Sequence, residues 1–569
     1  MIRKFAWLFA GAMLLPLLGF AQGTQKPPLP GMPPPPPATG PGAAPRIGEA
    51  PQGLPEAKMK EPMSREEWEK WYYKLYTIPK RGAILVGPKR VRLNKMMPQV
   101  YEIVNEDDTN YVVRNLPPDD PQSLGYRSWR HNERSEISLK AKQEYLRDKY
   151  LIVENPVVPP PFTDKLRFVE EDASLPKGGR WQVSFDIADM NGDGLPDLVF
   201  GPQRTGSPTP YIFLQQKDGS WKLWHDAKFP TEGLKLDYGS VRVADFDGDG
   251  KKDIAIACHF SKTYVLYGDG QGNFTRFATV PQTNREMTAR TLTVADLNGD
   301  GRPDIVTLDE VDIAMSTRRK LEGGLVNIAL NLPSGWKAVD AKGFSERVMG
   351  DGLTTADLDM DGKLDLLLTS RTVNALDLIY RNVDGGETWQ PVGSLQQPVY
   401  GYVYATAVGR LDRFKQPDVV ECIEQHNPWR SDTPTQACIV YRFHDAHGRT
   451  TMTPTPTVLF QEKSDTVNYK AVAVGDLDGD GRDDIVAVTN TGKVRVFLQG
   501  SDGIFFEQKD AGLDRPGTDL FDVKIADLHR DGKSEIVLVG SPAGATGGGV
   551  WIFKGVKAGS TAAGGTKTP

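Results

Sequence analysis

One short motif, rich in aspartate and glycine, recurs along most of this 569-residue chain and limits its fold more than any other feature. The clearest copy runs from Asp245 to Asp253, with aspartate at positions 1, 3, 5 and 9 and glycine at position 6. Successive copies begin 51 to 66 residues apart. A repeat of this length with short strands predicts four-stranded sheets arranged around an axis, one sheet to a copy. The seven copies begin at Asp189, Asp245, Asp296, Asp357, Arg410, Asp476 and Asp527.

Residues 162–556 are therefore predicted to form an all-β, seven-bladed β-propeller with an aspartate-rich loop in each blade. The runs Val241–Ala244 and Asp253–Ala257, on either side of the second loop, are short and rich in β-branched residues, as strands are. The last unit has only three such runs before the chain becomes rich in Gly, Ser, Thr and Ala. The run Lys165–Val169 precedes the first unit, and we expect it to supply the missing outer strand of the seventh blade and close the ring.

The amino terminus has the order of a secretory signal peptide over residues 1–21. Arg3 and Lys4 precede an apolar stretch, Phe5–Phe20, and cleavage is expected after Ala21. An uncleaved membrane anchor is the alternative, but about 16 apolar residues fall short of the ~20 that a spanning helix needs. We expect the protein to be secreted, to the extracellular space, the cell surface or the periplasm, with no transmembrane span after cleavage.

Two segments separate the signal peptide from the repeats. Residues 22–60 are rich in Pro, Gly and Ala and are predicted to be an extended linker. Residues 61–161 are predicted to be a small α+β region of no family that we recognise, and residues 557–569 a disordered tail. The elements expected in residues 61–161 are helices behind a capping box at Ser64 and over Ser138–Tyr150, and strands over Ala83–Val86 and Tyr111–Val113.

The loops have the composition of calcium sites. Aspartates packed this closely repel one another without a cation, and glycine at position 6 permits a sharp bend. Calcium takes about six to eight oxygen ligands, and the asparagine at position 3 of two copies still offers one. An EF-hand would need glutamate at position 12, where these loops have strand residues such as Ile256. We expect about five Ca²⁺ ions, bound by Asp189, Asn191, Asp193 and Asp197; Asp245, Asp247, Asp249 and Asp253; Asp296, Asn298, Asp300 and Asp304; Asp357, Asp359, Asp361 and Asp365; and Asp476, Asp478, Asp480 and Asp484.

The seventh loop differs at position 3, which is His529. Its carboxylates Asp527, Asp531 and Glu535 are candidate metal ligands, but a nitrogen ligand suits calcium poorly. A sixth calcium ion is therefore left open.

The fifth loop has Arg410 at position 1, Phe414 at position 5 and Lys415 at position 6, so we expect it to bind no metal. The same unit contains Cys422 and Cys438. A disulfide between them would close a loop of about 15 residues and would stabilise this blade in place of an ion. Whether these two cysteines pair is left open.

The repeats resemble the FG-GAP, or VCBS, repeats of integrin α-subunit propellers and of many secreted bacterial proteins. The resemblance covers about Phe162–Lys554, and position, residue type and spacing all recur in its loop motif. It implies a propeller with calcium in the loops that join the innermost strand of each blade to the next, and ligands on the opposite face. It implies little about the ligand, because propellers support many functions.

Several function classes lack sequence support. A net charge of −6 without a basic run argues against nucleic-acid binding. No nucleophile elbow, phosphate-binding loop, dinucleotide fingerprint or zinc-protease histidine pair is present. We expect an extracellular binding or adhesion scaffold for a protein or glycan. The alternative is a polysaccharide lyase or hydrolase, whose central funnel would be lined by Arg285, Arg290, Tyr402 and Tyr404; the oligomeric state is left open.

Overall fold

The structure is a computed structural model that describes parts of residues 84–154 and most of residues 161–557. Within those ranges, no helix is both long and apolar enough to cross a membrane. The predicted signal peptide, the linker, the helix at Ser64 and the tail beyond Lys557 lie outside the described residues. The described ranges are 84–87, 99–106, 109–115, 139–143, 145–146, 151–154, 161–171, 173–182, 184–203, 208–283, 287–309, 326–344, 352–369, 378–395, 401–425, 435–444, 449–501, 503–544 and 547–557.

The described residues between 84 and 154 form an antiparallel sheet with the order β4-β3-β2-β1-β5. Alternate residues such as Ile103 and Val113 are buried together with Leu85, so one face of the sheet carries a small core. The two predicted strands are confirmed. The helix predicted over Ser138–Tyr150 is wrong at its start, because Leu139–Lys142 pairs with a strand instead. The strands are β1 (Ile84–Gly87), β2 (Gln99–Glu106), β3 (Asn110–Asn115), β4 (Leu139–Lys142) and β5 (Leu151–Glu154).

The described residues from 161 onward fall into seven sheets, whose consecutive strands are antiparallel neighbours. Their bounds are β8 (Phe185–Ala188), β9 (Asp197–Phe200), β10 (Tyr211–Gln215) and β11 (Trp221–Leu223); β12 (Val241–Ala244), β13 (Asp253–Ala257), β14 (Thr263–Tyr267) and β15 (Arg276–Thr279); β16 (Thr291–Ala295), β17 (Asp304–Leu308), β18 (Val326–Leu332) and β19 (Gly335–Val339); β20 (Gly352–Ala356), β21 (Asp365–Thr369), β22 (Leu378–Asn382) and β23 (Trp389–Ser394); β24 (Gly401–Gly409), β25 (Asp418–Gln425), β26 (Thr435–His444) and β27 (Thr450–Lys463); β28 (Tyr469–Gly475), β29 (Asp484–Thr489), β30 (Val494–Gln499), β31 (Phe505–Gln508) and β6 (Phe162–Thr163); and β32 (Thr518–Ala526), β33 (Glu535–Pro542), β34 (Gly549–Lys557) and β7 (Leu166–Glu170).

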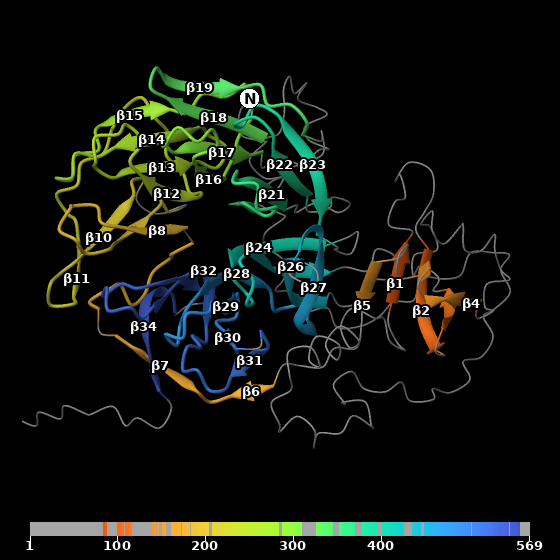
Figure 1. The fold of residues 1–569 in the computed structure, drawn as a ribbon. Coiled ribbons are helices and arrows are strands. Elements are labelled where there is room, and N and C mark those ends of the chain that lie inside the picture. The colour runs from red at the N-terminus through yellow and green to blue at the C-terminus, as the bar shows by residue number, and fades with distance from the viewer. Residues whose placement is uncertain are drawn as a thin grey trace, which may run out of the picture. The chain divides into compact units, whose positions relative to one another are not determined.

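Apolar side chains fill the spaces between successive sheets, so second strands such as β13 and β17 are buried on both faces. The last sheet also packs on the first, where Val537 and Val539 meet Phe185 and Leu198. The sheets therefore follow one another around a closed ring (Figure 1). The prediction of an all-β propeller is confirmed.

The ring is closed by strands from both ends of this region. β7 pairs with β34 in antiparallel register, with Glu170 opposite Phe553 and Leu166 opposite Lys557. The predicted outer strand is therefore confirmed. Leu166 and Phe168 of β7 are buried in the core between the sixth and seventh sheets. The short strand β6, just before β7, pairs with β31 of the sixth sheet, so this segment joins two neighbouring sheets.

Candidate metal centres

Each aspartate-rich loop joins the first strand of a sheet to the second. In the second sheet the loop leaves β12 at Ala244 and enters β13 at Asp253, and these two residues are paired across the two strands. In each of the other six sheets, an alanine or glycine is likewise paired with the acidic residue at position 9. The loops are thus seven copies of one hairpin, placed at the same edge of every sheet.

The aspartate at position 1 organises the loop through backbone hydrogen bonds. Asp245 Oδ1 accepts the N–H of Gly248 at 2.7 Å, and its Oδ2 accepts the N–H of Gly250 at 2.8 Å. Both glycines have positive φ, 78° and 83°, which favours glycine at positions 4 and 6. Asp189, Asp296 and Asp476 accept the equivalent bonds. The aspartate at position 1 therefore stabilises the turn, and its carboxylate lies inside the loop.

The acidic residue at position 9 is buried in all seven loops. Asp253 Oδ2 accepts the N–H of Phe246 at 2.8 Å, and Oδ1 accepts the N–H of Gly268 beyond the third strand at 2.8 Å. Burial raises the pKa of Asp253 to about 6 and that of Asp484 to about 8. Sequence reasoning assigned position 9 to a metal. The structure adds that this residue ties the loop to the backbone of the third strand.

In three loops the carboxylates converge. Asp476, Asp478 and Asp484 offer oxygens within 4.8 Å of one another, as do Asp245, Asp247 and Asp253 in the second loop and Asp357, Asp359 and Asp361 in the fourth. The Asp478 side chain is only 1% exposed, and its Oδ1 has no hydrogen-bond partner among the described residues. In the first and third loops, Asn191 and Asn298 instead accept a backbone N–H and donate to the aspartate at position 5. The second, fourth and sixth loops, which have aspartate at position 3, are therefore the more acidic centres.

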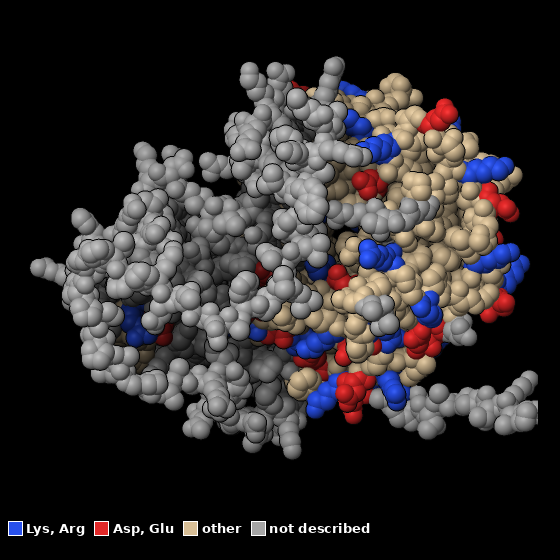
Figure 2. Space-filling view, turned by 180° about the vertical axis from the view of Figure 1, so that it is seen from behind, with Lys and Arg blue, Asp and Glu red and all other residues tan. Residues whose placement is uncertain are grey.

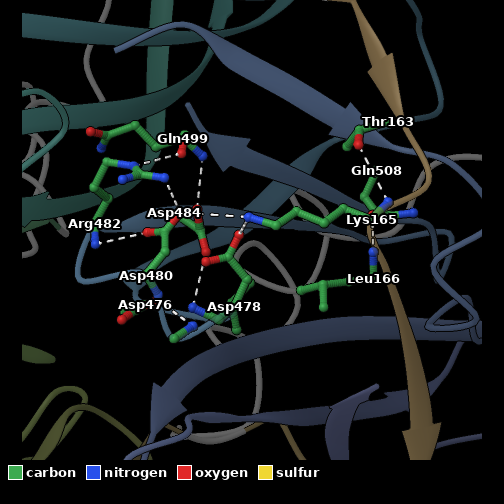
Figure 3. Close-up of polar contacts among 12 residues, drawn as sticks. Thr163, Lys165, Leu166, Asp476, Asp478, Asp480, Arg482, Asp484, Gln499 and Gln508 are labelled. Atoms are coloured by element: carbon green, nitrogen blue, oxygen red, sulfur yellow. Dashed lines mark hydrogen bonds and ion pairs between the residues drawn. The ribbon is translucent and has the colours of Figure 1, made fainter. Parts of the chain in front are cut away.

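In each of these three loops, the aspartate at position 3 forms an ion pair with a basic side chain from outside the loop. Arg276 pairs with Asp247, Arg381 with Asp359, and Lys165 with Asp478. Figure 3 shows Lys165 extending into the sixth loop, where its Nζ also lies 3.6 Å from Asp480. Sequence reasoning missed these cations. These cations come from outside the loops: Arg276 begins β15, Arg381 is in β22, and Lys165 lies between β6 and β7.

The seventh loop is organised differently. Asp527 accepts the N–H groups of Asp531 and Gly532, as position 1 does elsewhere. His529 Nε2 lies 3.0 Å from Oε2 of Glu171, a residue that sequence reasoning missed because it precedes the first repeat. The converging group here is mixed rather than all-aspartate, since Glu171, His529 and Glu535 bring ligand atoms within 4.8 Å of one another.

The fifth loop contains cations of its own. Asp412 accepts a hydrogen bond from His444 and lies 3.5 Å from Nε of Arg442. Asp412, Asp418 and His444 are close enough to bind an ion, but Arg442 already supplies positive charge to this buried group. That the loop binds no metal stays a prediction.

The two cysteines of the fifth sheet are directly opposite each other. Cys422 of β25 is the register partner of Cys438 of β26, and both are fully buried. In the structure they are free thiols, as is Cys258. The disulfide alternative is therefore not realised in this structure.

The residues considered for a catalytic funnel are only partly described. Arg290 is half-buried, and its carbonyl accepts the N–H of Ser240 at 2.7 Å. Arg285 and the side chains of Tyr402 and Tyr404 lie outside the described residues. The described structure therefore brings no funnel group together from these four residues.

Comparison with known proteins identifies the repeat, and two solved structures are similar to this chain. Residues 189–256, 245–307 and 476–538 match the family described as FG-GAP-like repeat, and these stretches contain five of the seven loops. No curated protein matches the chain. Among solved structures, "Structure of Dos1 propeller" is similar at 11% identity and a TM-score of 0.37, over 69% of this chain and 94% of that one. "Crystal structure of glucose dehydrogenase" is similar at 12% identity and a TM-score of 0.33, over 68% of this chain and 99% of that one.

Proposed function

The chain belongs to the FG-GAP repeat family, and from that premise we propose that it is a secreted, calcium-stabilised β-propeller that serves as an extracellular scaffold for binding a protein or glycan. The observation that carries the calcium part is the buried Oδ1 of Asp478, which has no hydrogen-bond partner among the described residues and lies beside Asp476 and Asp484. An unpaired carboxylate oxygen inside a protein is costly, and a bound cation would remove that cost.

The chemistry of the loops fits calcium among the common ions. Asp245, Asp247 and Asp253 present oxygen ligands only, and a flexible set of carboxylates and carbonyls is what calcium prefers. The carboxylates of the five loops named above would hold the ions, with backbone carbonyls completing each shell. The chemistry that calcium supplies there is charge neutralisation.

The proposed ions are structural. Each loop lies in the hairpin between the first two strands of a sheet, and strands such as β8 and β12 have only four residues. An ion that holds the turn would stabilise the pairing of such short strands. Because the ions would bind only the folded chain, each would add to the free energy of unfolding, by about 2.7 kcal/mol at a hundredfold excess over its Kd.

The scaffold part of the proposal rests on the predicted export signal and on the distribution of charge over the surface. A signal peptide and a proline-rich linker fit a protein that is released from the cell or displayed on it. On the face seen in Figure 2, Lys and Arg lie interspersed with Asp and Glu among uncharged residues. A surface of mixed charge suits a protein or glycan better than a nucleic acid, which needs clustered basic residues.

Thermal unfolding of the secreted chain in calcium and in excess EGTA tests the calcium part. We expect chelation to lower Tm and calcium, titrated back, to restore it. Asp478→Ala should lower the calcium stoichiometry by about one ion, because alanine removes the oxygen that asparagine at position 3 would still supply. Asp226→Ala, at an exposed turn outside the loops, is the matched control and should leave the stoichiometry unchanged. Equal Tm values in calcium and EGTA, together with no heat of calcium binding, would remove calcium from the proposal.

Glycan arrays and cell-surface protein arrays test the scaffold part. We expect saturable binding to a ligand of one class, without turnover and with weaker binding after chelation. Cleavage of a polysaccharide by the purified protein would contradict the scaffold and support the lyase or hydrolase alternative.

A further inference from the structure

Three side chains that are distant in the sequence meet at the closure of the ring. Glu171 directly follows β7, and its N–H donates to the carbonyl of Ile552 in β34 at 2.9 Å. His529 is position 3 of the seventh loop, and Glu535 begins β33. One ligand atom from each of Glu171, His529 and Glu535 lies within 4.8 Å of the other two. The group thus joins a segment before the first sheet to the last one.

Glu535 is an unusual member of this group because it is fully buried. Its Oε2 accepts the N–H of Leu528 at 2.9 Å, the bond that position 9 also makes in the first, second, third, fourth and sixth loops. Its Oε1 has no hydrogen-bond partner among the described residues. A buried carboxylate oxygen in this state lacks the partner that buried polar atoms normally have. Oε1 of Glu535 is therefore available as an oxygen ligand for a cation.

The imidazole nitrogen of His529 decides which cation this group would bind. Its Nε2 lies 3.0 Å and 3.2 Å from the two carboxylate oxygens of Glu171. Two ligands of a tetrahedral zinc ion, each about 2.0 to 2.1 Å from the metal, lie about 3.4 Å apart, so only a small shift is needed to admit one. Imidazole is a good ligand for zinc and other transition metals, whereas calcium takes oxygen ligands. The donors are thus of zinc type.

The other carboxylates of the loop have separate roles. Asp527 accepts the N–H groups of Asp531 and Gly532, at 3.0 Å and 2.8 Å. Asp531 Oδ1 accepts the N–H of Lys533, and Oδ2 lies 3.7 Å from Nζ of Lys554. The mixed group therefore shares only Glu535 with the oxygen set that the loop motif predicts.

We propose that Glu171, His529 and Glu535 form a zinc site, with one nitrogen and two carboxylate ligands and a water molecule in the fourth position. The two carboxylates balance the charge of Zn²⁺. The ion links the segment after β7 to the loop that leads into β33, so it fastens the closing strand to the last sheet. The site is independent of calcium in the other loops.

Metal titration of the full secreted chain tests this proposal. The protein is stripped of metals, saturated with Ca²⁺ and titrated with Zn²⁺ by calorimetry, and separately with Co²⁺, whose visible absorption reports tetrahedral nitrogen and oxygen ligands. We expect one equivalent of each ion. Because calcium is saturating, loss of the calcium proposal would leave the zinc equivalent unchanged.

Two variants locate the site. Glu171→Gln should weaken zinc binding at least tenfold and abolish the cobalt absorption. His529→Asp should do the same and should gain one calcium ion, since it restores an all-oxygen loop. His225→Asn, at an exposed turn, is the control for adventitious binding by a surface histidine. Far-UV circular dichroism verifies that each variant is folded.

Several outcomes would overturn the proposal. Failure of the wild-type chain to bind a stoichiometric zinc ion does so without reference to any variant. Unchanged zinc affinity in Glu171→Gln and His529→Asp does so as well, and loss of binding in His225→Asn alone would show an adventitious ion only.

Discussion

Arg495 of β30 and Glu507 of β31 form a two-point ion pair, with Nε 2.7 Å from Oε1 and Nη2 2.8 Å from Oε2. The guanidinium also lies 3.9 Å from the ring centre of Phe460, which belongs to β27 of the preceding sheet. Both charged side chains are largely buried. The pair therefore fixes two strands of the sixth sheet while its cation packs on the fifth.

Arg495→Lys should lower the free energy of unfolding by about 1.5 to 3 kcal/mol, because lysine cannot make the two-point contact or stack on the ring in the same way. Urea unfolding at neutral pH measures the change. The control is Lys337→Ala, which breaks the exposed pair with Glu387 and should cost under about 1 kcal/mol. Equal losses in the two variants would contradict the role assigned to burial and geometry.

The closing strand provides a second test. Phe168→Ala should lower the free energy of unfolding by about 3 to 5 kcal/mol, because Phe168 is 3% exposed in the core between the sixth and seventh sheets. Val169→Ala changes the next residue of the same strand, which is 41% exposed, and should have an effect within about 0.5 kcal/mol. Thermal and urea unfolding of both variants measure this contrast. Similar stability of the two variants would argue against β7 as part of the core.

The propeller could be predicted because its signals are local and repeated. Loop spacing indicated the sheets, and counting strands placed Lys165–Val169 in the last sheet, one residue from the observed Leu166–Glu170. Leu139–Lys142 was assigned wrongly to a helix, because pairing with Asn110–Asn115 outweighs helix propensity there. Tertiary pairing of this kind leaves no periodic signal in the sequence.

The candidate sites were predictable only where their residues are close together in the sequence. The motif identified the inward-facing aspartates, such as Asp245 and Asp253, because both belong to one short loop. Their distant partners were not predictable, since Lys165 is 313 residues from Asp478 and Glu171 is 358 residues from His529. Such pairs follow from the closure of the ring and require the three-dimensional structure.

The cysteines allow a test that separates thiol from disulfide. Cys422 and Cys438 are fully buried, and burial raises the pKa of Cys422 well above its ordinary value and that of Cys258 to about 12. A buried, protonated thiol reacts slowly. We expect iodoacetamide to label no cysteine in the native chain and three after unfolding without a reductant, as read by intact mass. Labelling of one cysteine before reduction and three after it would show that Cys422 and Cys438 are paired.

The cation-rich group of the fifth sheet should make stability depend on pH in a defined direction. Burial alone would raise the pKa of Asp412, but the hydrogen bond from His444 and the charge of Arg442 outweigh it and lower this pKa to about 2. For its neighbour Asp418, burial and the nearby Asp412 raise the pKa to about 7. The two carboxyls therefore affect stability with opposite signs.

Because the pKa of Asp412 is lower in the folded chain than in the unfolded one, its contribution is complete above the ordinary value of 3.8 and is lost as pH falls toward 2. Asp412→Asn should cost about 2 kcal/mol at pH 7, and roughly half of that at pH 3. Asp418→Asn is the matched contrast, because the ionised form of Asp418 is disfavoured in the folded chain and its cost grows as pH rises from 3.8 through 7. The stability of that variant relative to wild type should therefore increase over the same rise. Urea unfolding of the three proteins from pH 3 to pH 8 measures both trends, and parallel curves would show that neither carboxyl is coupled to folding.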